Sequence, residues 1–107
     1  ANPGVVASMR EMVAETPAEG YAACCAAIET MDLRDDLARI DVPALVIAGA
    51  DDPSTPPPHL RTIADGVDGA RYLEVAPGAH LASWEQADAV NEALRSHLER
   101  VTTEGRR

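Results

Sequence analysis

The sequence predicts an α/β fold built on two parallel strands, and three observations support this prediction. Residues 44–48, ALVIA, form a continuous apolar run of strand length, which is typical of a strand covered on both faces. Residues 71–75, RYLEV, form a second run of strand length. A helical pattern separates the two runs and another follows them. This order favours a parallel pair of strands joined by a right-handed crossover.

The first third of the chain is predicted to be helical. Val6, Met9 and Val13 recur at helical spacing. A second helix follows the stretch TPAE, in which Thr16 can act as the cap and Glu19 stands where a capping box places it. The apolar stripe of this second helix consists of Tyr21, Cys24 or Cys25, and Ile28.

Three more helices are predicted along the rest of the chain. Asp32 can cap the first of them, over DLRDDLARI, and PHLRTIADGV forms the second, between the two strands. The last begins near Ala87 and precedes a polar tail, residues 102–107, that is typical of a frayed end or a linker. The apolar stripe of the last helix consists of Val90, Leu94, Leu98 and Val101.

The two cysteines and the charge of the chain limit the classes of function. Cys24 and Cys25 are adjacent in a helical pattern, so they point about 100° apart and are not placed to bridge each other or to bind zinc. We expect both to be small buried hydrophobes in a reducing compartment, which favours a cytoplasmic location.

The formal net charge is −9, and every basic residue is an arginine. An acidic chain repels phosphate backbones, which argues against nucleic acid as a partner. No apolar run approaches the roughly 18–20 residues of a membrane span, and no signal sequence is recognisable. We therefore expect neither nucleic acid nor a membrane as a partner.

A sheet of two apolar strands must be covered or extended, because both of its edges are otherwise unpaired. We therefore expect the chain to be part of a larger sheet whose other strands precede residue 1 or come from a partner chain. By itself, the chain is expected to self-associate or to pair with the missing N-terminal part.

Polar side chains follow both predicted strands. Asp51 and Asp52 lie in the first loop, residues 49–57, and His80 lies in the second loop, residues 76–86. In open α/β sheets ligands bind outside the carboxyl ends of the strands. Neighbouring strands lie roughly 4.8 Å apart, so a carboxylate of the first loop can bind the imidazole of the second. Spacing alone does not choose between the two aspartates, and both loops are also compatible with ordinary turns.

The two loops resemble the C-terminal part of the α/β-hydrolase fold. GADDPSTP, residues 49–56, fits the Gly-x-x-Asp-x-x-x-Pro pattern around the acid of that family, and this resemblance selects Asp52. Gly-Ala-His ahead of a final helix fits the pattern around the catalytic base and selects His80. The stretch GYAACCAAIETMDLRDDLARIDVPALVIAGADDP further resembles the 3-oxoadipate enol-lactonases of the β-ketoadipate pathway in aromatic catabolism.

The resemblance implies a single partial α/β-hydrolase domain. Residues 1–41 would be the end of the helical cap and its connection, and residues 42–107 the last two strands and their helices. It further implies serine-type hydrolysis of an enol-lactone to 3-oxoadipate, with His80 and Asp52 as catalytic residues and no cofactor or metal. The nucleophile of the family lies in Gly-x-Ser-x-Gly, and this pattern does not occur in the sequence. We therefore expect a C-terminal segment that is inactive alone.

Other interpretations stay open. The chain could belong to a different hydrolase of the same fold, an esterase or a haloperoxidase-like enzyme, because substrate choice lies mostly in the cap. It could also be a non-catalytic interaction or dimerisation module. Some enol-lactonases are fused to a carboxymuconolactone decarboxylase domain, and the polar end RVTTEGRR suits a linker to such a domain as well as a plain C-terminus.

Overall fold

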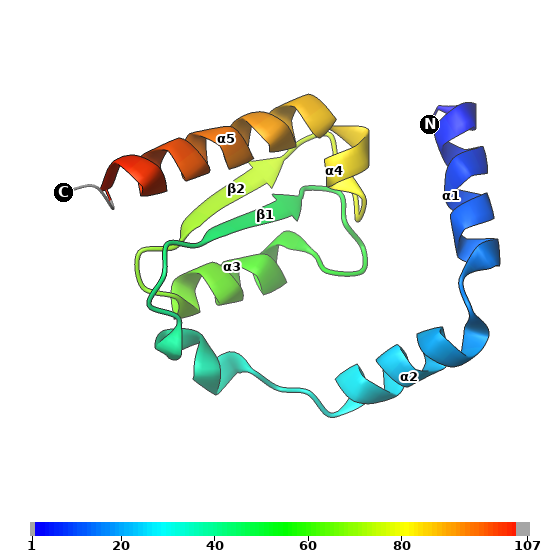
Figure 1. Cartoon of the computed structure of the whole chain (residues 1–107), viewed down its shortest axis with the longest axis horizontal. Coiled ribbons are helices and arrows are strands. Elements are labelled where there is room, and N and C mark those ends of the chain that lie inside the picture. Colours follow the sequence, from blue (N-terminus) through cyan, green and yellow to red (C-terminus); the bar gives the residue numbers. More distant parts are fainter. Residues whose placement is uncertain (1, 105–107) are drawn as a thin grey trace. The chain divides into compact units, whose positions relative to one another are not determined.

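The computed structural model of the chain describes residues 2–104. They fall into two compact units, which divide between Asp32 and Leu33. The first unit consists of two helices, and the second contains both strands and the remaining helices (Figure 1). The division that the sequence suggested, residues 1–41 and 42–107 within one domain, stays a prediction.

The first unit contains α1 (Pro3–Glu15) and α2 (Ala18–Glu29), the two helices that the sequence predicts. Neither helix has a buried residue. Cys24 and Cys25 are free thiols and both are exposed. The expectation that they are buried is therefore wrong, because two helices without a further layer in their unit remove little side-chain surface from water.

The turn between these helices differs from the predicted capping box. The hydroxyl of Thr16 donates to the carbonyl of Met12 at 2.9 Å, so it binds the last turn of α1 rather than the first turn of α2. Pro17 occupies the N-cap position of α2, and no side chain caps that helix. The predicted cap at Thr16 is wrong because its hydroxyl is already used by the preceding helix.

The second unit is built on two parallel strands, β1 (Leu45–Gly49) and β2 (Arg71–Val75). Their register runs from Leu45 opposite Arg71 to Gly49 opposite Val75. The predicted parallel pair is confirmed, with β1 shifted by one residue from the apolar run. The crossover between the strands contains α3 (Pro57–Gly66). Within the described residues, β1 pairs with β2 alone.

Two helices follow β2. The short α4 (Ala82–Glu85) lies in a segment that was predicted to be a loop, and α5 (Ala87–Glu104) is the predicted last helix. Figure 1 shows α3 and α5 on either side of the two strands. The helices thus cover both faces of the sheet, as its continuous apolar strand requires. The buried hydrophobic residues of this core are Val46, Ala48, Val67, Val75, Ala82 and Val90.

The segment before β1 forms η1 (Arg34–Arg39), a short 3₁₀ helix. Leu33 occupies its N-cap position, so the prediction that Asp32 caps this helix is wrong. The observed helix begins at Arg34, one residue later than a helix capped by Asp32 would begin. Leu37 packs against α3 at Gly66, where a Cβ atom would overlap the Leu37 side chain.

The inward stripe of α5 also differs from the prediction. Val90 is buried, but Leu94 and Leu98 are 43% and 63% exposed. Ala93 and His97 are the half-buried residues in their place. The predicted stripe advanced by four residues at each of its first two steps. Each such step drifts about 40° around a helix of 3.6 residues per turn, so an inward stripe must alternate steps of three and four.

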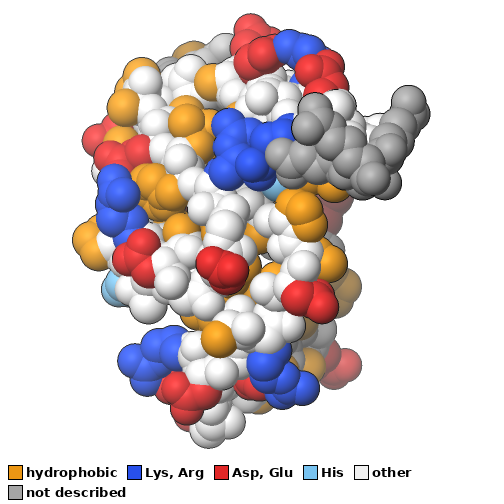
Figure 2. Space-filling model, turned by 90° about the vertical axis from the view of Figure 1, so that its left-hand side faces the viewer, with side chains coloured by type: hydrophobic (Ala, Val, Ile, Leu, Met, Phe, Trp, Pro, Cys, Tyr) orange, Lys and Arg blue, Asp and Glu red, His pale blue; other side chains and the backbone are white. Residues whose placement is uncertain are grey.

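The predicted tail is helical over its first part. Residues 102–104 continue α5, and the hydroxyls of Thr102 and Thr103 donate to the carbonyls one turn earlier, on Leu98 and Glu99. The rest of that predicted tail, residues 105–107, lies outside the described residues. Among residues 2–104, no helix combines the length and apolar character that crossing a membrane demands. On the face drawn in Figure 2, hydrophobic side chains lie at the surface among acidic and basic ones.

Candidate active site

The loop after β1 presents a buried carboxylate. Asp52 is 7% exposed, and its Oδ1 accepts hydrogen bonds from the backbone N–H groups of Ser54 at 2.8 Å and Thr55 at 3.1 Å. An aspartate that accepts from the backbone two or three residues later is a common way to form a turn. The local sequence Asp-Pro-Ser-Thr therefore fixes one carboxylate oxygen in the loop and leaves Oδ2 for other partners.

The loop after β2 brings His80 to that free oxygen. The distance between His80 Nδ1 and Asp52 Oδ2 is 2.9 Å. The side chain of His80 is 59% exposed, whereas that of Asp52 is 5% exposed. The ring nitrogen that does not face Asp52 is Nε2. The pair therefore has a buried acid, and a base that solvent or a substrate can approach. The expected contact is present, and the catalytic role of both residues stays a proposal.

The two loops are also joined through their backbones. The N–H of Ala50 donates to the carbonyl of Val75 at 2.9 Å, and the N–H of Asp51 donates to the carbonyl of Gly78 at 2.8 Å. The N–H of Gly78 donates to Oδ2 of Asp51 at 3.4 Å. Asp51 thus bridges the loops, while Asp52 contacts the imidazole. The structure thus distinguishes the contacts of the two aspartates, which sequence spacing alone could not do.

The approach of the loops depends on a glycine. A Cβ atom at Gly49 would overlap the carbonyl oxygen of Ala79 and lie 2.8 Å from that of Gly78. Glu85 secures the same stretch from the other side, because its Oε2 accepts the N–H of Ala79 at 2.7 Å. Neither contact was predicted from the sequence. Glu85 stands five residues after His80 and Gly49 three before Asp52, spacings that by themselves indicate no contact.

The environment of Asp52 favours its charged form. Burial of the carboxyl raises its pKa, but hydrogen bonds from His80, from the hydroxyl and N–H of Thr55, and from the N–H of Ser54 lower it by more. The net result is a pKa well below the usual range of an aspartate. A carboxylate that stays ionised can accept the Nδ1 proton of His80, fix the tautomer of the ring and stabilise the imidazolium.

The four serines of the sequence lie in other settings. Ser8, Ser83 and Ser96 lie within α1, α4 and α5, and Ser54 lies in the loop after β1. Among the described residues, no hydrogen bond joins a serine hydroxyl to His80; the hydroxyl near its ring belongs to Thr55, whose Oγ1 lies 3.4 Å from Nδ1. These serines therefore offer no contact of the kind that activates a nucleophile.

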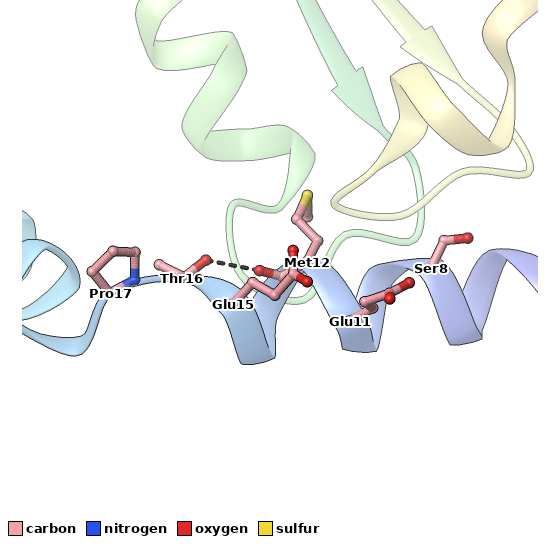
Figure 3. Close-up of a pocket in the computed structure, with 6 residues that line it drawn as sticks. All are labelled: Ser8, Glu11, Met12, Glu15, Thr16 and Pro17. Atoms are coloured by element: carbon pink, nitrogen blue, oxygen red, sulfur yellow. Dashed lines mark hydrogen bonds between the residues drawn. The ribbon is translucent and has the colours of Figure 1, made fainter.

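The first unit has a shallow hollow of about 470 Å³ along α1 and the turn that follows it (Figure 3). Its lining contains two carboxylates but no basic residue. Ser8 reaches it from a helix rather than from a strand-to-helix turn, so the hollow does not supply the geometry of an activated serine. The lining residues are Ser8, Glu11, Met12, Glu15, Thr16 and Pro17.

Within residues 2–104, no cluster of three or more histidine, cysteine, aspartate or glutamate side chains is arranged to bind a metal ion. His59, at the start of α3, is exposed. The groups that the structure describes at the site are the Asp52–His80 pair and the residues that fix it.

Comparison with known proteins gives a family match. The model of the alpha/beta hydrolase fold matches residues 4–87. A 3-oxoadipate enol-lactonase of Acinetobacter baylyi is 38% identical over 104 residues. That match covers 92% of this chain and 37% of the relative.

Solved structures are similar over the same extent. The enol-lactonase of Burkholderia xenovorans superposes with a TM-score of 0.87 at 39% identity, over 91% of this chain and 37% of that protein. A thermophilic esterase of Thermogutta terrifontis superposes with a TM-score of 0.86 at 30% identity, over 94% of this chain and 37% of that protein. The chain thus spans little more than a third of the length of these relatives.

Proposed function

The chain belongs to the α/β-hydrolase fold family, and from this membership we propose that it is the C-terminal segment of a serine-type hydrolase. The proposed substrate is an enol-lactone, hydrolysed to 3-oxoadipate in the catabolism of aromatic compounds. The similarity to the Acinetobacter and Burkholderia enol-lactonases supports this substrate.

The observation that carries the proposal is the contact between Asp52 and His80. A buried carboxylate lies 2.9 Å from an exposed imidazole, at the carboxyl ends of two parallel strands. This edge is where α/β sheets bind ligands. The arrangement supplies the base and its orienting acid, which are two of the three groups of a serine hydrolase.

The proposed mechanism assigns one role to each group. A serine from a part of the protein that precedes this chain attacks the lactone carbonyl, and Nε2 of His80 accepts the serine proton. Asp52 accepts the Nδ1 proton and stabilises the imidazolium. His80 then returns its proton to the leaving enol oxygen and activates water against the acyl-enzyme. By itself, the chain is proposed to be inactive, because the groups of a triad act as a unit.

The same proposal includes a partner and a location. The unpaired edge of β1 is proposed to pair with a strand of the N-terminal part of the protein or, without it, with another copy of the chain. The free thiols Cys24 and Cys25 fit the reducing cytoplasm, which we propose as the location.

The experiment is a hybrid enzyme in which this chain replaces the matching segment of the Acinetobacter baylyi enol-lactonase. We expect the hybrid to hydrolyse the enol-lactone of 3-oxoadipate. His80→Gln should lower kcat/KM on the order of 10⁴-fold or more. His59→Gln, at the exposed start of α3, is the matched control and should leave kcat/KM unchanged. A folded hybrid without activity toward this lactone would contradict the proposed substrate.

The same hybrid distinguishes the alternatives. The similarity to the Thermogutta esterase favours a general esterase as the second candidate. If the hybrid hydrolyses simple esters through His80 but not the lactone, an esterase or another hydrolase of the fold is the better account of this segment. If the hybrid folds and His80→Gln has no effect on either substrate, a non-catalytic interaction module is the better account.

A further inference from the structure

Thr55 lies next to the Asp52–His80 pair and contacts both members. Its hydroxyl donates to Oδ2 of Asp52 at 2.7 Å, the same oxygen that faces Nδ1 of His80 at 2.9 Å. The distance from the Thr55 hydroxyl to Nδ1 of His80 is 3.4 Å. One carboxylate oxygen, one hydroxyl and one imidazole nitrogen therefore form a closed triangle.

The carboxylate of Asp52 is fixed at both of its oxygens. The N–H groups of Ser54 and Thr55 bind Oδ1, and the hydroxyl of Thr55 binds Oδ2. Rotation of the carboxylate about its Cβ–Cγ bond would break both sets of hydrogen bonds. Without the hydroxyl, the imidazole of His80, on an exposed loop, would be the remaining partner of Oδ2.

The single hydroxyl proton also limits where the imidazole proton can lie. The shorter contact of the hydroxyl is to Asp52, so its proton lies there, and its oxygen presents a lone pair toward His80. Nδ1 thus faces two acceptors, the carboxylate and the hydroxyl oxygen. For the neutral ring, these surroundings favour the tautomer that carries its proton on Nδ1 rather than on Nε2.

We propose that Thr55 is a positioning residue of the acid–base pair, whose hydroxyl holds the Asp52 carboxylate turned toward His80 and stabilises its charge. The inference rests on the proposed function, because Thr55 is proposed to act through the base His80. The other carboxylates near these loops, Asp51 and Glu85, bind the backbone of Gly78 and Ala79 rather than the Asp52 carboxylate.

The test is a titration of the Asp52 carboxyl carbon by NMR in the chain labelled with ¹³C-aspartate. Thr55→Val replaces the hydroxyl with a methyl group of similar volume, and Thr55→Ser retains the hydroxyl. We expect Thr55→Val to raise the proton affinity of Asp52 about two- to tenfold, the range of one net hydrogen bond. Thr55→Ser should leave it unchanged. Thr62→Val, which removes an exposed hydroxyl of α3, is the matched control and should also leave it unchanged.

Two results would overturn the proposal. The first is a Thr55→Val chain whose Asp52 titrates as in the unmodified chain. The second is an equal shift in Thr55→Ser, which would assign the effect to packing rather than to the hydroxyl. If Thr55→Val does not fold, Thr55→Ala replaces it. In the unmodified chain, an Asp52 carboxyl that titrates near the ordinary value of about 3.9 also overturns the proposal.

The NMR titration measures proton binding by the Asp52 carboxylate and does not depend on hydrolysis of a lactone. A shift in Thr55→Val together with an inactive hybrid enzyme would reject the proposed hydrolysis and retain the role of Thr55. An active hybrid with no shift would reject the role of Thr55 alone.

Discussion

At the scale of single residues, the site depends on how Asp52 is kept charged inside the fold. Among residues 2–103, Asp52 is the charged residue that the fold buries. An ionised carboxylate is costly to bury unless donors surround it. Here two N–H groups, one hydroxyl and one imidazole do so. The same donors lower the pKa of Asp52, which links the site to the stability of the fold.

This link predicts how stability depends on pH. The folded-state pKa of Asp52 lies below its unfolded-state value of about 3.9. Asp52 therefore stabilises the folded chain above that pH, and the contribution is lost as the pH falls through the folded-state pKa. We expect Asp52→Asn to flatten the fall in the free energy of unfolding below about pH 4.

Urea unfolding of the chain between pH 2 and pH 7 measures this dependence. Asp65→Asn removes an exposed carboxylate of α3 and is the matched control; its slope against pH should match that of the unmodified chain. A slope that Asp52→Asn leaves unchanged would contradict the assignment of the stabilising charge to Asp52.

The sequence predicted part of this site. Asp52 and His80 follow two strands directly, and the family pattern separates Asp52 from Asp51, so both were found without coordinates. Thr55 and the bridging role of Asp51 were not found. Their partners, His80 and Gly78, lie 25 and 27 residues away in the other loop, and no periodicity in a single sequence records such contacts.

At the scale of elements, the geometry of the Asp52–His80 contact depends on the close approach of two loops at the end of the sheet. β1 ends at Gly49 and β2 at Val75, opposite each other in the parallel register. The histidine loop then folds back over Gly49, at a distance that leaves no space for a Cβ atom. The short helix α4 follows directly, and it places Glu85 so that its Oε2 accepts a hydrogen bond from the N–H of Ala79.

Gly49→Ala tests this approach. The added methyl group would overlap the Ala79 carbonyl, and the loop would have to move away from Asp52. We expect a loss of about 1–3 kcal/mol in the free energy of unfolding, the usual range for overpacking. Gly20→Ala is the control, because a Cβ atom there meets nothing within 4 Å and the position lies inside α2.

That control should be neutral or stabilise its helix by up to about 1 kcal/mol. Urea unfolding measures both variants. A Gly49→Ala chain as stable as the unmodified one, with its Asp52–His80 contact intact by NMR, would show that the loop approach is not required.

The sequence predicted the positions of the helices and strands better than it predicted which side of a helix faces the core. RYLEV gave β2 with its observed bounds, because both its composition and its flanking turn are local signals. The inward stripe of α5 was wrong at Leu94 and Leu98, because successive steps of four residues drift around the helix and away from the side that faces the sheet. The helix α4 was missed because a four-residue helix has too few residues to show a period.

At the scale of the whole molecule, apolar surface lies exposed in both units. In the first unit the exposed large hydrophobic side chains include Val13, Tyr21 and Ile28, and in the second they include Val42, Trp84 and Leu98. The second unit also holds a sheet in which β1 pairs with β2 alone among the described strands. Unpaired strand edges and exposed apolar patches are features that proteins usually cover.

We therefore predict that the purified chain self-associates. Size-exclusion chromatography with light scattering should give a mass above that of one chain, 11.3 kDa, and the mass should rise with concentration. If the N-terminal part of the hybrid enzyme covers these surfaces, as proposed, the mass of the hybrid should not rise with concentration. A well-folded monomer of the isolated chain at high concentration would contradict the prediction.

We propose that Asp52, and not its neighbour Asp51, orients His80 for hydrolysis. The most direct measurement compares Asp52→Asn and Asp51→Asn in the hybrid enzyme, as kcat/KM for the enol-lactone. We expect a loss on the order of 10⁴-fold for Asp52→Asn and of no more than about tenfold for Asp51→Asn, which weakens one loop hydrogen bond. Equal losses in the two variants, or full activity in Asp52→Asn, would contradict it.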